Sequence, residues 1–257
     1  MPEITAYDEG TPCWIDLATP DVAGAMEFYA RLFGWAYLGT GERGGGYQLA
    51  TLRGKQVAAI GPKPPDQPGP SAWTTYLWSH NADAAAQRVT KAGGTLFAGP
   101  FDVPGAGRTA IAADPTGAVF GIWQGVGHRG AQLANEPGAF IWNENLNDEP
   151  AAARAFYEAV FGYTYERYGD WVAEYDVFKV NGEIRGGIGG KPPQIPAGTP
   201  NFWNTYFGVA DTDAAVALVH GGGGRVLLEP ADTPMGRMAV ITDRGGAQLS
   251  IIAPRPV

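Results

Sequence analysis

Apolar and polar positions alternate along the chain in short stretches of two kinds. Residues 14–18 (WIDLA) alternate with a period of two, which is typical of a strand. Residues 19–21 (TPD) then begin a stretch with apolar side chains on one helical face up to Phe33, and Gly34 follows. Because proline is tolerated in a first turn and glycine often ends a helix, the pattern predicts a strand followed by a helix.

The rest of the first half is predicted to be mainly strands. The turn pair Arg53-Gly54 separates two of them, and the turn DPTG separates the last two. The run GPKPPDQPGP must be a surface connection, because proline donates no hydrogen bond to a helix or a central strand. The expected strands are 47–52, 56–60, 73–78, 108–112 and 119–123, and the expected second helix, closed by two glycines, is 83–92.

The second half of the chain repeats the first. The separation between matched residues is 128 positions early in the repeat and 129 or 130 later, so the insertions and deletions are very small. This regularity indicates a duplication, and the same order of elements is expected again from Phe140 to Ile252. The matched pairs include Trp14 and Trp142, Tyr29 and Tyr157, Tyr47 and Tyr175, Trp73 and Trp203, Tyr76 and Tyr206, and Asp114 and Asp243.

The segment between the two copies is rich in glycine and carries asparagine and proline, which is typical of a linker. We therefore expect one domain at 1–127 and a second at 137–257, with a linker at about 128–136. Each domain contains two halves of the order strand, helix, strands, which places the chain in the α+β class.

Composition and charge exclude several classes of protein. The formal net charge is −8, and the 18 lysines and arginines form no run, so the basic stripe of a nucleic-acid-binding protein is missing. An acidic surface is compatible with plain solubility or with a cationic partner. Cys13 is the only cysteine, which excludes a disulfide framework and favours a reducing compartment. The first ten residues lack the features of a signal peptide, and no apolar stretch is long enough to span a bilayer, so we expect a cytoplasmic protein.

Several motifs together carry a family resemblance. The segments FYARLFGW and FYEAVFGY end the first helix of each copy, WTTY and WNTY follow in a strand, and DPTG leads into the last strand, which ends in GIW. In this order the chain resembles the vicinal oxygen chelate superfamily, which includes glyoxalase I, the bleomycin-resistance binders and the extradiol dioxygenases. More narrowly, it resembles the two-domain glyoxalase-like proteins, and the resemblance covers nearly the whole chain. It implies tandem glyoxalase-like domains, each of two βαβββ modules that form a curved sheet around a cavity.

The resemblance also implies where a metal would bind in enzymes of this family. Their divalent metal is held by His, Glu or Gln side chains and polarises two vicinal oxygens of the substrate. The three histidines of this chain, His80, His128 and His220, are expected at a helix start, in the linker and at a helix end. Because Trp and Gly cannot ligate a metal, and Thr, Asn and Ser are poor sole ligands, we expect no metal site and no cofactor. The matching positions are Trp14 and Trp142, the stretches 57–61 and 185–189, Thr74 and Asn204, and Gly121 and Ser250.

If the first strand of each copy runs as the resemblance implies, alternation places Trp14 with Asp16, and Trp142 with Glu144, on the cavity side. An aromatic cavity with one carboxylate suits a planar organic ligand, and the carboxylate beside an indole also suits a cation. The alternatives without a binding role are that the tryptophans belong to the hydrophobic core and that the carboxylates are helix caps or salt-bridge partners. The expected ligand-binding residues are Trp14, Asp16, Tyr47, Thr74, Tyr76, Trp78, Trp123, Trp142, Glu144, Tyr175, Asn204 and Tyr206.

Four hypotheses of function remain open at this point. The first is a metal-free protein that binds a small aromatic or amphipathic molecule, such as a natural product or antibiotic, for sequestration, self-resistance or help to a biosynthetic enzyme. The second is a metal-independent lyase or isomerase with Asp16 or Glu144 as general acid or base. The third is a metal-dependent glyoxalase-like lyase, and the fourth is an interaction module with vestigial cavities. The partner is expected to be a small molecule, which can be cationic and aromatic, and the chain a pseudo-dimeric monomer or a homodimer.

Overall fold

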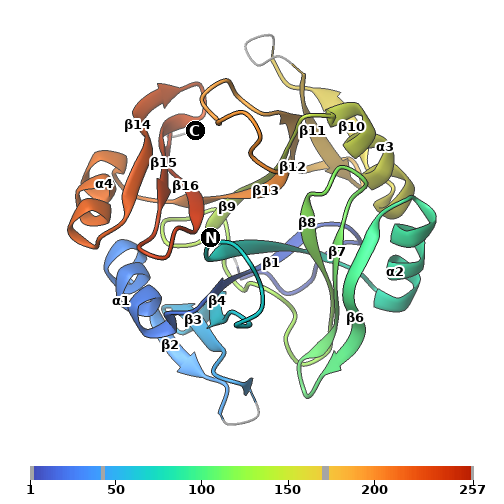
Figure 1. Ribbon diagram of the computed structural model, residues 1–257, viewed down its shortest axis with the longest axis horizontal. Helices are drawn as coiled ribbons and strands as arrows, with labels where there is room; N and C mark the ends of the chain where they lie inside the picture. Colours follow the sequence, from blue (N-terminus) through green and yellow to red (C-terminus); the bar gives the residue numbers. More distant parts are fainter. Residues whose placement is uncertain (1–2, 42–43, 170–173, 256–257) are drawn as a thin grey trace.

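The computed structural model describes residues 3–41, 44–169 and 174–255, and these form two eight-stranded mixed sheets and four helices (Figure 1). The first sheet has the order β2-β3-β4-β1-β5-β8-β7-β6, and the second has the order β10-β11-β12-β9-β13-β16-β15-β14. Equivalent strands therefore occupy equivalent places in the two sheets. The expected α+β fold of tandem domains with curved sheets is confirmed.

The first sheet and its helices come from the first half of the chain. A βαβββ module of β1 to β4 with α1 is followed by a module of β5 to β8 with α2. Their bounds are β1 Pro12–Thr19, α1 Val22–Phe33, β2 Ala36–Gly39, β3 Gln48–Leu52, β4 Lys55–Pro62, β5 Ala72–Trp78, α2 Ala82–Lys91, β6 Thr95–Val103, β7 Gly107–Ala113 and β8 Val119–Gly125.

The second sheet repeats this arrangement in the second half of the chain. Its bounds are β9 Phe140–Asn147, α3 Pro150–Phe161, β10 Thr164–Arg167, β11 Tyr175–Val180, β12 Glu183–Gly190, β13 Phe202–Gly208, α4 Thr212–Gly221, β14 Arg225–Thr233, β15 Gly236–Thr242 and β16 Gln248–Pro254. In both sheets the first strands of the two modules pair antiparallel, β1 with β5 and β9 with β13. This central pair carries the side chains that form the candidate sites.

Local sequence explains how α1 begins and ends. The side chain of Asp21 accepts a hydrogen bond from the backbone N–H of Gly24, which satisfies one of the free donors of the first turn. Gly34 ends the helix in the left-handed conformation, with a φ of 72°. The described helices are at most 12 residues long, and none has the length and apolar character needed to cross a membrane.

The two sheets pack against one another through shared hydrophobic cores. Helix α1 lies beside α4, and α2 lies beside α3, on opposite sides of the molecule (Figure 1). Each core therefore combines the first module of one half with the second module of the other half. At the centre, Asn143 Oδ1 accepts hydrogen bonds from Thr75 Oγ1 at 3.1 Å and from Thr205 Oγ1 at 2.9 Å.

A buried tyrosine–aspartate pair crosses the interface on each side. The hydroxyl of Tyr29 in α1 donates to Asp243 Oδ2 at 3.1 Å, and the hydroxyl of Tyr157 in α3 donates to Asp114 Oδ2 at 3.1 Å. Each aspartate lies in the turn before the last strand of the opposite half and also accepts backbone N–H groups of its own turn. The F-Y and D-x-x-G motifs are therefore partners across the interface, although they lie far apart in the sequence.

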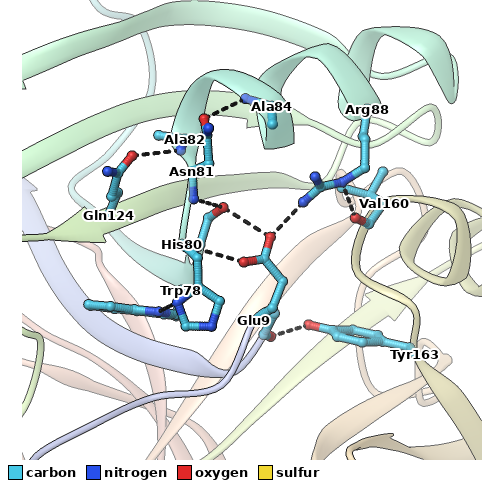
Figure 2. A network of polar contacts seen from close by, with 12 residues as sticks. Glu9, Trp78, His80, Asn81, Ala82, Ala84, Arg88, Gln124, Val160 and Tyr163 are labelled. Atoms are coloured by element: carbon cyan, nitrogen blue, oxygen red, sulfur yellow. Dashed lines mark hydrogen bonds and ion pairs between the residues drawn. The ribbon is translucent and has the colours of Figure 1, made fainter.

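The N-terminal segment adds a polar contact between the halves (Figure 2). The carboxylate of Glu9 accepts hydrogen bonds from Ser79 Oγ, from the backbone N–H of His80 and from Arg88. Arg88 Nε donates in turn to the carbonyl of Val160 at 2.7 Å. In the same place Tyr163 of the second half donates to the carbonyl of Gly10 at 2.5 Å (Figure 2).

The connection between the sheets packs against the first sheet instead of running free. Ala131 donates its backbone N–H to the carbonyl of Cys13 at 2.8 Å, and Gln132 donates to the carbonyl of Gln56 at 2.8 Å. Tyr7 donates its hydroxyl to the carbonyl of Ala131 at 2.6 Å. The side chains of Ala131, Leu133 and Ala134 are buried, so this segment is part of the core of the first half.

Candidate functional sites

A hydrogen-bonded chain of aromatic side chains ends at a carboxyl group in the first half. Trp14 Nε1 donates to the hydroxyl of Tyr47 at 3.0 Å, and Tyr47 donates to Asp16 Oδ2 at 2.9 Å. Tyr76 donates to the same oxygen at 3.0 Å. Strand pairing explains the arrangement, since Trp14 lies opposite Tyr76 and Asp16 lies opposite Thr74 in the β1–β5 pair. Side chains opposite one another in such a pair share one face of the sheet.

The second half repeats this arrangement with one additional donor. Trp142 Nε1 donates to Tyr175 at 2.9 Å, and Tyr175 donates to Glu144 Oε2 at 2.8 Å. Glu144 Oε1 accepts from Tyr206 at 2.8 Å and from Asn204 Nδ2 at 3.2 Å. The amide of Asn204 also donates to Ser250 Oγ at 3.0 Å, while its Oδ1 is buried without a partner in the described part of the chain.

Glycines make the room that the tyrosine rings occupy. A Cβ atom at Gly121 would lie 2.1 Å from the ring of Tyr76, and one at Gly61 would lie 2.7 Å from the ring of Tyr47. In the second half a Cβ at Gly187 would lie 1.9 Å from the hydroxyl oxygen of Tyr175. Real Cβ atoms do not approach so closely, so any larger residue at these positions would displace a phenol from its carboxyl group.

Burial shifts the ionisation of both carboxyl groups. It raises the pKa of Asp16 to about 6, even though the hydrogen bonds from Tyr47 and Tyr76 act in the opposite direction. Burial also raises the pKa of Glu144 against the effect of its two phenol donors and Asn204. In the described residues, no positively charged side chain is among the groups that shift either pKa. Among the residues that the structure describes, each carboxyl group is therefore held without a cation beside it.

A pocket of about 220 Å³ gives access to the first carboxyl group. Of the residues predicted to bind ligand, Asp16 and Tyr47 line it, and Leu17 and Ala18 contribute the adjoining part of β1. The remaining lining residues are Gly44, Gly45, Gly61 and Pro62. The pocket is thus acidic at one point and otherwise formed by small or apolar groups.

The predicted aromatic residues at the other end of the first cavity are covered. Trp78 and Trp123 are adjacent on β5 and β8, and both are more than 90% buried. The indole of Trp78 donates to His80 Nδ1 at 3.3 Å, and that of Trp123 donates to the carbonyl of His128 at 2.9 Å. Neither indole is among the residues that line the pocket at Asp16.

The positions that hold a metal in related enzymes do not fit one here. Among residues 3–41, 44–169 and 174–255, no three His, Cys, Asp or Glu side chains are grouped as a metal would need. The ring of Tyr76 fills the space at Gly121, and the amide hydrogens of Asn204 point at Glu144 and Ser250. Each site therefore surrounds its single carboxyl group with hydrogen-bond donors instead of further ligands.

Sequence reasoning missed two features of these sites. Gly121 and Ser250 were considered only as positions without a ligand, whereas one makes space for a phenol and the other binds Asn204. His128 lies in the segment between the two sheets, and its ring contacts Trp14, with the ring centroids 4.3 Å apart. The duplicated Trp-x-acid pattern was the signal that located both carboxyl groups, and nothing in the glycine-rich segment indicated this contact.

Comparison with known sequences identifies the family. A model of the Glyoxalase/Bleomycin resistance protein/Dioxygenase superfamily matches residues 13–122 and 146–251. Putative glyoxylase CFP32 of Mycobacterium bovis is 44% identical over 262 residues, which cover 100% of this chain and 99% of that protein. Anthracycline biosynthesis protein DauV of Streptomyces sp. (strain C5) is 36% identical over 97% of this chain and 95% of that protein.

Solved structures show the same fold at low sequence identity. A Mn(II)-bound glyoxalase from Novosphingobium aromaticivorans superposes with a TM-score of 0.66 and 16% identity, covering 96% of this chain and 83% of that one. BphC, a halotolerant catechol dioxygenase, superposes with a TM-score of 0.63 and 14% identity, covering 96% of this chain and 87% of that one. At such identities the likeness describes the fold and not the chemistry.

Proposed function

This chain belongs to the Glyoxalase/Bleomycin resistance protein/Dioxygenase superfamily, and from that premise we propose that it is a metal-free binding protein for a small aromatic or amphipathic molecule. The bound molecule carries a positively charged amine that pairs with Asp16 or Glu144. The biological use is accessory to the biosynthesis of a natural product, or resistance to one. We further infer a cytoplasmic chain that acts as a monomer of two domains, 1–127 and 137–257.

The observation that carries this proposal is the repeated buried carboxyl group. Asp16 and Glu144 each accept hydrogen bonds from two phenols, and burial raises the pKa of both. A charged group kept in such surroundings destabilises the fold, and groups of this kind are concentrated at functional sites. An ammonium group of a ligand would remove the penalty, because it supplies the missing opposite charge.

The size and lining of the pocket at Asp16 indicate which part of such a ligand would bind there. Its volume of about 220 Å³ is below the roughly 300–1,000 Å³ of most ligand pockets. It therefore suits an amine-bearing substituent better than a whole polycyclic molecule. Relatives named as anthracycline biosynthesis proteins support an aromatic natural product as the ligand class. In the second half, the buried Asn204 Oδ1 offers a further acceptor for an N–H donor of the ligand.

The donor set supports binding without a metal. A divalent ion needs several oxygen, nitrogen or sulfur ligands around one point, and each site here offers one carboxyl group surrounded by phenol and indole donors. The tyrosine and tryptophan groups instead fix the orientation of that carboxyl group. No step of the proposed function passes through a metal ion.

A second candidate function is general acid–base catalysis without a metal. It is favoured by Asp16, because a carboxyl group with a pKa of about 6 exchanges protons near neutral pH and lies at the wall of a pocket. Tyr47 and Tyr76 would then hold the carboxyl group toward the substrate. In this case the bound molecule would be converted to a product instead of being released unchanged.

The experiment that tests the proposal is a binding screen with matched ligands. An amine-bearing anthracycline and its N-acetyl derivative share an aromatic system but differ in charge. Calorimetry should give binding of the amine and much weaker binding of the N-acetyl derivative, and chromatography should recover the amine unchanged. Recovery of a product would favour the acid–base enzyme. If neither compound binds, nor any other aromatic amine of a panel, the proposal fails.

A further inference from the structure

A histidine from the connection between the two sheets packs against two tryptophans of the first half. The imidazole of His128 lies edge-on to Trp14, with centroids 4.3 Å apart and an interplanar angle of 81°. Its centroid is 5.5 Å from that of Trp123, and its carbonyl accepts the indole N–H of Trp123. The ring therefore contacts two of the aromatic residues that the sequence predicts to bind ligand.

The backbone around His128 is fixed to the first sheet at several points. The backbone N–H groups of Val126, Gly127 and His128 all point to the carbonyl of Ala106 in the turn between β6 and β7, at 2.8 to 3.0 Å. Further along, the N–H groups of Ala131 and Gln132 bond to β1 and β4, as described above. The segment is thus held to the first sheet by backbone hydrogen bonds before and after His128.

Close backbone packing allows this segment little freedom. A Cβ at Gly125 would lie 2.3 Å from the carbonyl oxygen of His128, and a Cβ at Gly130 would lie 2.5 Å from the carbonyl oxygen of Cys13. Gly130 also has a φ of 98°, which strains any other residue. These glycines allow the segment to approach the sheet closely enough for the imidazole to reach the indoles.

Only one of the two ring nitrogens of His128 has a hydrogen-bond partner among the described residues. His128 Nδ1 lies 2.8 Å from Gln56 Oε1, whereas Nε2 is buried without a partner among the described residues. Burial lowers the pKa of the ring to about 4, so the imidazole is neutral at physiological pH. A neutral aromatic ring placed against two indoles, with one nitrogen unsatisfied, resembles a bound heterocycle more than an optimised core residue.

The second half keeps Trp142 at the position of Trp14 but lacks the second indole that such a ring contacts. By the repeat, Ile252 takes the position of Trp123. The aromatic slot is therefore a property of the first half alone, and so is the histidine that fills it.

We propose that His128 is a specificity-determining residue that fills an aromatic slot at Trp14 and Trp123. With His128 in place, a planar ring of a ligand cannot stack in this slot, and a ligand reaches Asp16 through the pocket at Gly44, Gly45 and Pro62. The biological meaning of this inference rests on the proposed binding function, but the slot itself can be tested without the natural ligand.

Imidazole is the probe for the slot, because it reproduces the side chain that His128→Ala removes. The readout is the set of indole N–H resonances of the full chain in two-dimensional NMR, with Trp14→Phe and Trp123→Phe used to assign two of them. His220→Ala serves as the matched control, since it removes an exposed histidine at the end of α4. Imidazole should shift the Trp14 and Trp123 resonances of His128→Ala in a saturable manner, and should leave those of the parent and of the control unchanged.

Two results would overturn the inference. Equal shifts of these resonances in the parent protein would mean that the slot is already open. An unperturbed spectrum of folded His128→Ala at saturating imidazole would mean that no slot exists. If His128→Ala does not fold, His128→Ser, which keeps a polar side chain, is titrated in its place and is judged by the same two results. Failure of the proposed function would appear separately, as absence of binding of aromatic amines to the parent protein.

Discussion

Tyr76 donates a hydrogen bond of 3.0 Å to Asp16 while its ring fills the space over Gly121. The same carboxyl oxygen accepts the hydroxyl of Tyr47. In this way the ring of Tyr76 fills a position where the family resemblance implies a metal ligand, and its hydroxyl stabilises the charged form of the carboxyl group. Glu144 and Tyr206 repeat this relationship in the second half, with Ser250 in place of Gly121.

Tyr76→Phe should raise the pKa of Asp16 above its value of about 6, because the charged form loses one of its two phenol donors. The carboxyl carbon of Asp16 can be followed by NMR titration and assigned with Asp16→Asn. Tyr37→Phe is the control, since the hydroxyl of Tyr37 donates to the carbonyl of Met26 and not to Asp16. An unchanged or lower pKa in Tyr76→Phe would mean that this hydrogen bond does not stabilise the carboxylate.

Asp16→Asn should stabilise the protein at neutral pH. The folded state binds a proton at Asp16 more tightly than the unfolded state, because the pKa is raised from 3.8 to about 6. The destabilisation is therefore nearly complete above about pH 7 and disappears only as the pH falls below the ordinary value of 3.8. The free energy of unfolding of the variant should exceed that of the parent by up to about 3 kcal/mol at pH 7.5, at roughly 1.4 kcal/mol per pKa unit, and the difference should vanish below about pH 3.

Urea unfolding of both proteins at several pH values measures this difference in the free energy of unfolding. The contributions of all other titrating groups are the same in the two proteins and cancel in the difference. A difference that does not change with pH would show that the charge of Asp16 is not the source of the effect.

Purified protein should contain no stoichiometric transition metal. The reason is the donor set, in which one carboxyl group per site faces tyrosine and tryptophan donors instead of further ligands. Elemental analysis after purification without chelators is the measurement, with a metal-bound glyoxalase of the same fold as the positive control. About one equivalent of Zn, Ni, Mn or Fe per domain, lost in a Glu144→Gln variant, would refute the account of the site.

Tyr29→Phe and Tyr157→Phe should each destabilise the fold by about 1–3 kcal/mol. Each change leaves a buried aspartate oxygen and a tryptophan N–H without their shared partner, since Trp73 and Trp203 donate to these hydroxyls. Chemical denaturation compares both variants with Tyr37→Phe, whose hydroxyl bonds within its own half and should matter less. Equal effects at all three positions would argue against a special role of the pairs across the interface.

The sequence alone predicted the duplication, the α+β fold and the two carboxyl groups, because these depend on local periodicity and on the repeat. Helix α1 and strands β1 and β5 agree with the expected ranges within about two residues. Strands β2 and β6 were not expected, because most of their residues are exposed and show no clean alternation. The residues of β6 also include Gly99 and Pro100, which obscure a strand pattern.

The remaining features depend on contacts between distant segments. The partnership of Tyr29 with Asp243 spans 214 positions, and no local pattern indicates it. The same is true of His128, whose glycine-rich surroundings suggested a linker although they allow close packing. The phenol donors of Asp16 were predicted to lie near it, but only the structure shows that both bind the same oxygen.

The most direct test of the account is calorimetry of the parent, Asp16→Asn, Glu144→Gln and the double variant with an amine-bearing anthracycline and its N-acetyl derivative. Each single variant should weaken binding of the amine at one site, by about 1–3 kcal/mol. The double variant should lose the preference for the amine, while the N-acetyl derivative should bind all four proteins alike. If the folded double variant binds the amine as tightly as the parent does, the carboxyl groups are structural and the central claim is wrong.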